Sequence, residues 1–301
     1  MSNLIIGFGT QGKKRLDHIT KNQTNTAIYD KFYNGTHENI IKNLDKVNLN
    51  KISHVYICLP ENQKEKYLKY FLSLNKHVLI EKPLSLDSQL IKSLIKNIKS
   101  TSYTAYNHRF EPHIIHIKKI LQKKTIGEIY NLKIYYGNGT AMLWKNNWRS
   151  QDKFSILHDL GSHVLDIILF LFDSLPKKFQ INIAQKNELP CYDFFQFSSR
   201  DKISLSATLS IINWQNYFYL DIIGSKGSVH LNGLCKWGPS ILKVNRRVLP
   251  SGFPIQKVNK LIMKDPTWAL EEKYFRKISK SGINNLENDI LINSAIEKIK
   301  C

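Results

Sequence analysis

The chain has 301 residues, enough for two domains, and its 42% hydrophobic and 23% charged residues are typical of a soluble globular protein. Its 44 basic and 24 acidic side chains give a formal net charge of +20, which favours an anionic partner. The basic residues are nevertheless dispersed, and no basic-aromatic motif accompanies the short clusters at 13–15 and 123–124, so we expect no nucleic-acid partner.

The first predicted element is an apolar strand at residues 3–6, and no basic region precedes it, which argues against a signal peptide. A G-x-G-x-x-G motif follows the strand at once and leads into a predicted helix that ends near Ile19. In this context Gly7 permits the tight turn, Gly9 lets a pyrophosphate approach the backbone, and Gly12 lets the helix pack on the strand. The N–H groups at the helix start would bind the phosphates. The predicted cofactor contacts here are Gly7, Phe8, Gly9, Thr10, Gln11 and Gly12.

The second predicted strand, residues 26–29, ends at Asp30, which lies 18 residues after Gly12. A carboxylate at this position accepts hydrogen bonds from the adenosine ribose hydroxyls and repels a 2′-phosphate, so NAD is favoured over NADP. The adjacent Lys31 would soften that preference, and NADP stays open as the cofactor. The alternative interpretation of Asp30 is a turn-forming aspartate after a strand.

Further strands and helices continue in alternation, which indicates a doubly wound parallel sheet. The strands are predicted at 54–59, 77–80 and 103–106, and the helices at 61–74 and 87–99. Because ligands bind at the carboxyl ends of the strands in such a sheet, Leu59 and Pro60 are also predicted cofactor contacts. We therefore expect a dinucleotide-binding (Rossmann) domain over residues 1–106.

Glu81, Lys82 and Pro83 follow the strand at 77–80 directly. Pro83 favours an extended backbone at Lys82, so the lysine is expected at the end of the strand and not on a helix. An ammonium group there can stabilise an oxygen that is losing a proton. The alternative is a solvated Glu-Lys pair at the start of a loop. Glu81 and Lys82 are also predicted to contact the cofactor.

The alternation ends near Asn107, and a different pattern begins. A helix is predicted at 112–123, followed by strands in which Ser and Thr interleave with apolar residues, as in an antiparallel sheet with unequal faces. These strands are 129–136, 179–184, 194–198, 203–212 and 217–223, with a hairpin turn at 224–227 and helices at 266–279 and 286–300. We therefore expect an α+β domain with a mainly antiparallel open sheet over residues 107–301.

The predicted sheet also bears on assembly. Its strands place residues on both faces, and the predicted helices are too short to form a second covering layer. An uncovered face of this kind would be an apolar patch. We therefore expect a homodimer or homotetramer joined through it.

Asp159 and His163 precede the longest apolar run of the chain and are four residues apart. On a helix or its first turn, this spacing places two side chains on one side. A histidine that titrates near neutrality beside a carboxylate suits general acid-base catalysis. Two such ligands without a third do not make a zinc site, so we expect no metal. The alternative is a helix start that Asp159 caps while His163 packs.

Two features predict a soluble protein of the cytoplasm. The apolar run at 164–172 is interrupted by Asp166 and is too short to cross a bilayer, so we expect no membrane partner. The cysteines lie far apart without a C-x-x-C pair, which fits a reducing compartment. They are Cys58, Cys191, Cys235 and Cys301.

These motifs together resemble the landmarks of the glucose–fructose oxidoreductase / inositol dehydrogenase / MocA (Gfo/Idh/MocA) family of NAD(P)-dependent sugar dehydrogenases. The residues that carry the resemblance, in the order of the family, are 7–12, 81–83, 106–110, 148–149 and 159–166. Glu-Lys-Pro together with the later Asp-x-Gly-x-His is the specific part. Two departures concern the substrate: residues 153–156 lack the glycines often found before the catalytic aspartate, and Lys64 stands near the place of a histidine.

The resemblance implies hydride transfer between NAD(H) and a secondary hydroxyl or ketone of a sugar, cyclitol or nucleotide-linked sugar. It implies catalytic roles for Lys82, Asp159 and His163, and the candidates for substrate contact are Asn107, Arg109, Trp148 and Arg149. Either arginine could bind a carboxylate or phosphate through its planar guanidinium; packing and ion pairing are the alternative. Two other functions stay open: an NAD-binding regulator or scaffold without activity, and a reductase of an imine or linear tetrapyrrole.

Overall fold

A computed structural model of the chain describes residues 2–20, 25–35, 37 and 40–301. The chain forms two compact units. The first unit consists of residues 1–107 and 268–293, and the second of residues 108–267 and 294–301. The chain therefore passes from the first unit to the second, returns to the first at residue 268, and ends in the second.

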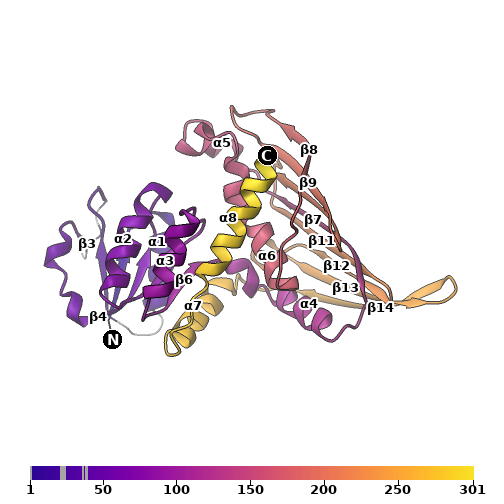
Figure 1. Ribbon diagram of the computed structural model, residues 1–301, viewed down its shortest axis with the longest axis horizontal. Helices are drawn as coiled ribbons and strands as arrows, with labels where there is room; N and C mark the ends of the chain where they lie inside the picture. The colour runs from indigo at the N-terminus through magenta and orange to yellow at the C-terminus, as the bar shows by residue number, and fades with distance from the viewer. Residues whose placement is uncertain (1, 21–24, 36, 38–39) are drawn as a thin grey trace. The chain divides into compact units, whose positions relative to one another are not determined.

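The first unit contains a parallel sheet with helices between its strands (Figure 1). The strands are β1 (Ser2–Ile6), β2 (Thr26–Tyr29), β3 (Ile40–Ile41), β4 (Ile52–Ile57), β5 (His77–Glu81) and β6 (Ser102–Ala105), and the helices are α1 (Thr10–Thr20), α2 (Glu61–Ser73) and α3 (Ser88–Asn97). The strand order is β3-β2-β1-β4-β5-β6, and every neighbouring pair is parallel. The order reverses between β1 and β4, as in a doubly wound nucleotide-binding fold. The predicted Rossmann fold is confirmed.

The sheet of the first unit is apolar on both faces, as expected for central parallel strands. Ile57 and Ile80 are fully buried. Two helices from the far end of the sequence, α7 (Thr267–Ile278) and α8 (Leu286–Lys300), contribute to this core. Phe275 meets Tyr56 edge to face with ring centroids 5.7 Å apart, and Leu286 belongs to the same apolar cluster as Ile80.

The second unit contains a large, mainly antiparallel sheet and several helices (Figure 1). The strands are β7 (Ile129–Gly137), β8 (Gln180–Gln185), β9 (Phe194–Arg200), β10 (Ser204–Ser210), β11 (Tyr217–Gly224), β12 (Gly227–Asn232), β13 (Ser240–Val248) and β14 (Gly252–Leu261), and the helices are α4 (Pro112–Gln122), α5 (Ala141–Trp144) and α6 (Ser162–Phe172). The strand order is β14-β13-β12-β11-β7-β10-β9-β8, and within it β7 and β10 are parallel neighbours. The predicted α+β fold with an antiparallel open sheet is confirmed. None of the helices in the described ranges has both the length and the apolar character needed to cross a lipid bilayer.

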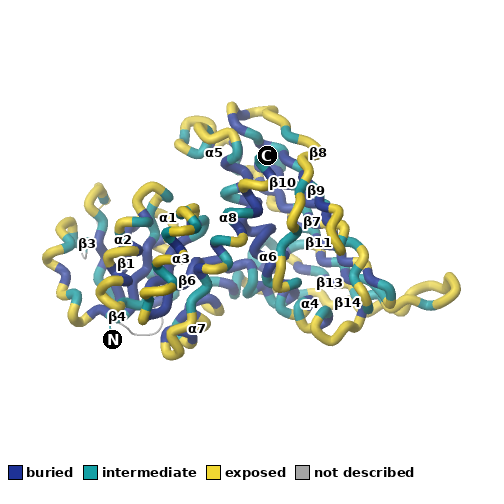
Figure 2. Tube along the Cα trace, viewed as in Figure 1, coloured by how far each residue is buried: buried dark blue, intermediate teal, exposed yellow. Residues whose placement is uncertain are grey.

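The two faces of this sheet differ in polarity. At one edge of the sheet, β14 is exposed along nearly its whole length (Figure 2). In β10 the alternate residues Leu205, Ala207 and Leu209 are buried, and Ser206 and Thr208 between them are half-buried.

The same outward positions of β11 and β12 carry a hydrogen-bonded row of polar side chains. His230 contacts Asp221 through Nδ1 and lies 2.8 Å from Ser228 Oγ through Nε2. The outward face of these central strands is therefore mixed in character, because Tyr217 and Ile223 of β11 are exposed on it beside the serines, the threonine and the paired polar residues.

Candidate active site

The glycine-rich turn between β1 and α1 requires two of its glycines. Gly7 has φ +90°, and a Cβ atom there would lie 2.7 Å from the carbonyl oxygen of Cys58. A Cβ atom on Gly12 would lie 2.1 Å from the carbonyl oxygen of Gly7. Gly9 is different, because a Cβ atom there would meet nothing within 4 Å. Gly7 and Gly12 thus shape the turn, and Gly9 leaves open space beside it.

Asp30 is bound to this turn through its side chain. Its Oδ2 atom accepts a hydrogen bond of 2.8 Å from the backbone N–H of Phe8, and its Oδ1 atom accepts one of 3.0 Å from the N–H of Phe32. A carboxylate has about four acceptor sites, so capacity remains for ribose hydroxyls. The open space at Gly9 and the carboxylate held beside the turn fit a bound dinucleotide. Half-buried Leu59 borders Gly7, whereas Pro60 is exposed at the start of α2.

Glu81 ends β5 and is held in a buried ion-pair network. Arg15 of α1 donates to Glu81 through Nε and to Glu271 of α7 through Nη2, each at 2.7 Å. All three side chains are almost completely buried. Burial raises the pKa of Glu271 to about 7 against the opposing effect of Arg15. This geometry gives Glu81 a structural partner within the first unit.

Lys82 follows the carboxyl end of β5 and lies in a turn to which Lys64 is hydrogen-bonded. The Lys82–Pro83 peptide bond is cis. The ammonium group of Lys64 on α2 donates to the carbonyl oxygen of Pro83, and at 2.8 Å to Glu61. Burial lowers the pKa of Lys64, and Glu61 opposes that shift. Sequence analysis gave Lys64 no role. The available signal was its place on the apolar stripe of α2 with Leu68 and Phe71.

Asp159 and His163 lie at the start of α6, in a conformation that the sequence did not indicate. Residues Leu157–Gly161 form a π-helical turn, and α6 continues from Ser162. The hydroxyl of Ser162 donates to the carbonyl oxygen of His158 at 2.7 Å within this turn. The π-helical turn is wider than an α-helical one, but residues four apart still lie close to one side of it, so the expectation that Asp159 and His163 share one side remains a prediction. Such π-helical turns are frequent at functional sites.

His163 is buried in a cluster of rings in the second unit. Its ring stacks on His108 with centroids 4.0 Å apart and meets Tyr136 of β7 at 6.0 Å, edge to face. Burial raises the pKa of the Tyr136 phenol, and the negative charge of Asp159 raises it further. Asp159 therefore acts electrostatically on the same cluster. Lys236 donates to Nε2 of His108. Sequence analysis assigned no role to His108, Tyr136 or Lys236, which only the fold brings together.

The four residues predicted to contact the substrate differ in burial and in their partners. The Nε atom of Arg109 donates to both oxygens of fully buried Asp166, at 2.7 and 2.9 Å. Burial raises the pKa of Asp166 and the guanidinium of Arg109 lowers it. The guanidinium of Arg149 lies 4.6 Å from the ring centroid of Trp148, which is 52% exposed. Asn107 is buried at the end of the first unit.

Each unit thus holds part of the predicted site. The glycine-rich turn, Asp30, Leu59 and Lys82 belong to the first unit, and Asp159 and His163 to the second. That Lys82 and His163 act on one substrate oxygen remains a prediction.

Models of known protein families match both units. The model of the oxidoreductase family with an NAD-binding Rossmann fold matches residues 1–108. The model of the GFO/IDH/MocA C-terminal domain matches residues 114–230. Together the two matches cover most of the chain.

The chain also resembles individual proteins. It is 22% identical to glucose-6-phosphate 3-dehydrogenase of Bacillus subtilis (strain 168) over 161 residues, which cover 51% of this chain and 45% of that protein. It is 25% identical to inositol 2-dehydrogenase of Rhizobium meliloti (strain 1021) over 189 residues, which cover 59% and 56%. The chain thus spans about half the length of these curated relatives. Levoglucosan dehydrogenase in complex with NADH has the same fold, with a TM-score of 0.83 and 17% identity over 99% of this chain and 96% of that one.

Proposed function

The chain belongs to the GFO/IDH/MocA oxidoreductase family, and from that premise we propose that it interconverts a secondary hydroxyl and a ketone on a sugar, cyclitol or nucleotide-linked sugar. The observation that carries the proposal is the buried His163 ring, stacked on His108 and in contact with Tyr136, whose phenol is under the charge of Asp159. Such an arrangement suits a proton acceptor. The curated relatives, named for glucose 6-phosphate and inositol, support a polyhydroxylated substrate.

The first unit is an NAD(P)-binding Rossmann domain, and we assign NAD(H) as its preferred cofactor. The turn at 7–12 would hold the pyrophosphate, and Asp30 would accept hydrogen bonds from the adenosine ribose. When bound, the nicotinamide accepts or supplies the hydride. Asp30 supports NAD because a carboxylate repels the 2′-phosphate of NADP. Lys31 follows Asp30 in the sequence and would soften this preference; its ammonium lies 5.6 Å from the ring centroid of Phe32.

We assign proton transfer to the side chains of the protein. In the oxidative direction His163 would accept the hydroxyl proton, and in the reductive direction it would return it. Asp159 would stabilise the charged imidazolium. General acid-base catalysis of this kind accelerates a reaction by about 10²–10⁴. Lys82 would donate a hydrogen bond to the same oxygen as negative charge develops on it, and Lys64 would position Lys82 by holding the Pro83 carbonyl.

Substrate contacts are proposed mainly for exposed side chains. Trp148 offers a largely exposed ring on which a sugar can pack, and Arg149 beside it offers donors for a phosphate or carboxylate. Asn107 is kept as a hydrogen-bonding candidate. Arg109 is the weakest candidate, because its guanidinium is already paired with Asp166.

The decisive experiment is a screen for NAD(H)-dependent absorbance change against sugars, sugar phosphates, cyclitols and nucleotide-linked sugars. We expect turnover with one class, and its loss in His163→Ala with NAD binding retained. Tight NAD binding without turnover on any substrate class would refute the dehydrogenase proposal and favour a regulatory or scaffold protein.

A further inference from the structure

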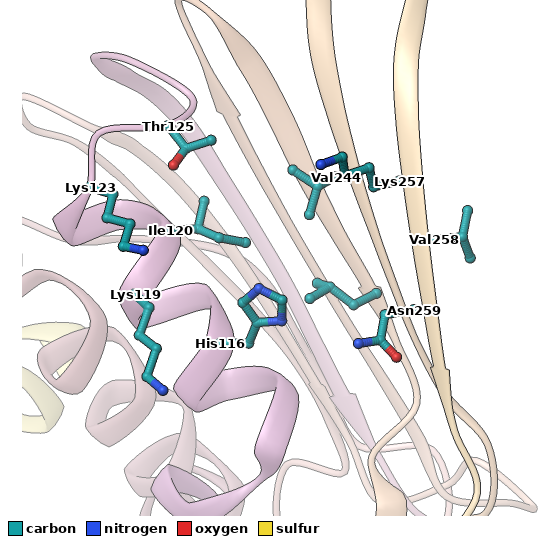
Figure 3. Close-up of a pocket in the computed structure, with 10 residues that line it drawn as sticks. His116, Lys119, Ile120, Lys123, Thr125, Val244, Lys257, Val258 and Asn259 are labelled. Atoms are coloured by element: carbon teal, nitrogen blue, oxygen red, sulfur yellow. The ribbon is translucent and has the colours of Figure 1, made fainter.

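The second unit has a pocket that none of the candidate catalytic residues lines. It has a volume of about 520 Å³ and lies between the C-terminal half of α4 and the strands β13 and β14 (Figure 3). His116 and Ile120 project from α4 towards the strands. Leu242 and Val244 line the opposite side, so the floor is apolar. The volume is that of a small-molecule site.

The rim of this pocket is strongly basic. Lys119 comes from α4, Lys123 follows the last residue of α4, and Lys257 comes from β14. No acidic residue lines the pocket. The ion pairs formed within the described residues include none of these three lysines. Lysines in the last turn of a helix are also favoured by the helix dipole, but that accounts for neither Lys257 nor the missing acids. The local excess of positive charge favours the binding of an anion.

A buried polar atom lies at the adjoining end of the pocket. A hollow of about 380 Å³, lined by His113 and shared with His116 and Lys119, continues the pocket along α4. His113 is 2% exposed, and its Nδ1 atom lies 2.8 Å from Ser240 Oγ. Its Nε2 atom has no hydrogen bond of good geometry within the described part of the chain, although Asn259 lies near. A buried polar atom of this kind is costly, and a ligand can satisfy it.

We propose that this pocket binds an organic anion with an aliphatic body, such as an alkyl phosphate or a carboxylate. The lysines would bind the anionic head as point charges. Ile120, Leu242 and Val244 would cover the aliphatic body. No Phe, Tyr or Trp lines the pocket, and the small imidazole of His116 is the one ring among its lining residues, so the pocket favours an aliphatic body over a flat base or a sugar ring. The ligand class thus differs from the substrate class proposed above.

Calorimetric titration with decyl phosphate, kept below the concentration at which it forms micelles, tests the proposal. We expect saturable binding of one molecule per chain, with much weaker binding of inorganic phosphate, which lacks the body, and of decanol, which lacks the charge. Decanoate distinguishes a phosphate from a carboxylate head. The Lys119→Glu/Lys257→Glu variant should weaken binding by at least about tenfold.

A matched control is available on the same strand. Lys260 is exposed on β14 but does not line the pocket, so Lys260→Glu should bind decyl phosphate as the unmodified chain does. Val244→Phe, which fills the floor without changing charge, should also weaken binding. The proposal is overturned if decyl phosphate does not saturate, if inorganic phosphate binds as tightly, or if Lys260→Glu is as damaging as the double variant.

Discussion

Cofactor choice should depend on Asp30, which we propose binds the ribose and which anchors the glycine-rich turn. Asp30→Ala should narrow the difference between the Kd values of NADH and NADPH by about tenfold or more, because the repulsion of the 2′-phosphate is lost. Fluorescence titration measures both values. Because alanine also releases the N–H groups of Phe8 and Phe32, Asp30→Asn is the matched variant: it removes the charge and keeps an acceptor. Tighter binding of NADPH than NADH by the unmodified protein would sink the assignment.

His54 makes the first unit sensitive to acid. Its ring contacts Ser279 at 3.0 Å and Ser53 at 2.8 Å, and burial, with help from Arg276, lowers its pKa from 6.5 to about 3. The unfolded chain therefore binds a proton below pH 6.5 that the folded chain does not. The free energy of unfolding decreases as the pH is lowered from 6.5 to 3. The slope contributed by His54 is at most about 1.4 kcal/mol per pH unit.

Urea denaturation across this pH range checks the effect of His54. His54→Gln keeps hydrogen-bonding groups but cannot take up the proton, so its unfolding free energy should depend less on pH. His116→Gln, at an exposed histidine, should leave the slope unchanged. Equal slopes for the unmodified chain and His54→Gln would show that His54 does not cause the sensitivity.

Among elements, Arg15 connects α1, β5 and α7 within the first unit. Arg15→Met would leave Glu81 and Glu271 buried without their partner, so we expect a loss of about 3–5 kcal/mol in the free energy of unfolding. Lys14→Met removes the same charge from the neighbouring position, where the ammonium lies 5.3 Å from the ring centroid of Trp268, and should lose less than about 1 kcal/mol. Similar losses in the two variants, measured in urea, would contradict a structural role for the network. Adding Glu271→Gln to Arg15→Met should recover part of the loss.

These elements also mark where sequence reasoning ended. The alternation of strands and helices and the motifs at 7–12 and 81–83 were sufficient to predict the Rossmann fold, because each is a local pattern. Arg15 stood in a short basic cluster, and no local pattern marked its ion pair because its partner Glu271 is 256 residues away. The strands β13 and β14 escaped notice because β14 is exposed along nearly its whole length, so no alternation of apolar residues marks it. The π-helical turn before α6 has no periodicity of its own within five residues.

At the scale of the whole molecule, we still expect a homodimer or homotetramer joined through the open sheet, with a contact surface of mixed polarity. Polarity is no obstacle, because non-obligate interfaces are about as apolar as the rest of a protein surface. Ser206→Arg places a large charge at an outward position of β10 and should shift the mass measured by light scattering to that of a monomer. Ser174→Arg, in an exposed loop, should not. A monomer mass for the unmodified chain at micromolar concentration would refute the assembly.

The proposed mechanism requires Lys82 of the first unit and His163 of the second to act on one substrate oxygen, and kinetics can test this directly. Lys82→Met should preserve the fold and NAD binding but reduce kcat by about 10² or more, because its charge is needed mainly as the oxyanion develops. His163→Ala should lose a comparable factor, least at high pH where hydroxide can replace the base. Lys92→Met, at an exposed lysine of α3, serves as the control.

The double variant decides whether Lys82 and His163 cooperate. Two groups that stabilise charge on the same oxygen are coupled, so Lys82→Met/His163→Ala should lose far less than the product of the two single losses. If the groups acted at separate places, the factors would multiply and the free-energy losses would add. Full multiplication, or a Lys82→Met variant with unchanged kcat on an identified substrate, would show that Lys82 does not share the oxygen of His163. The mechanism would then need another donor from the first unit.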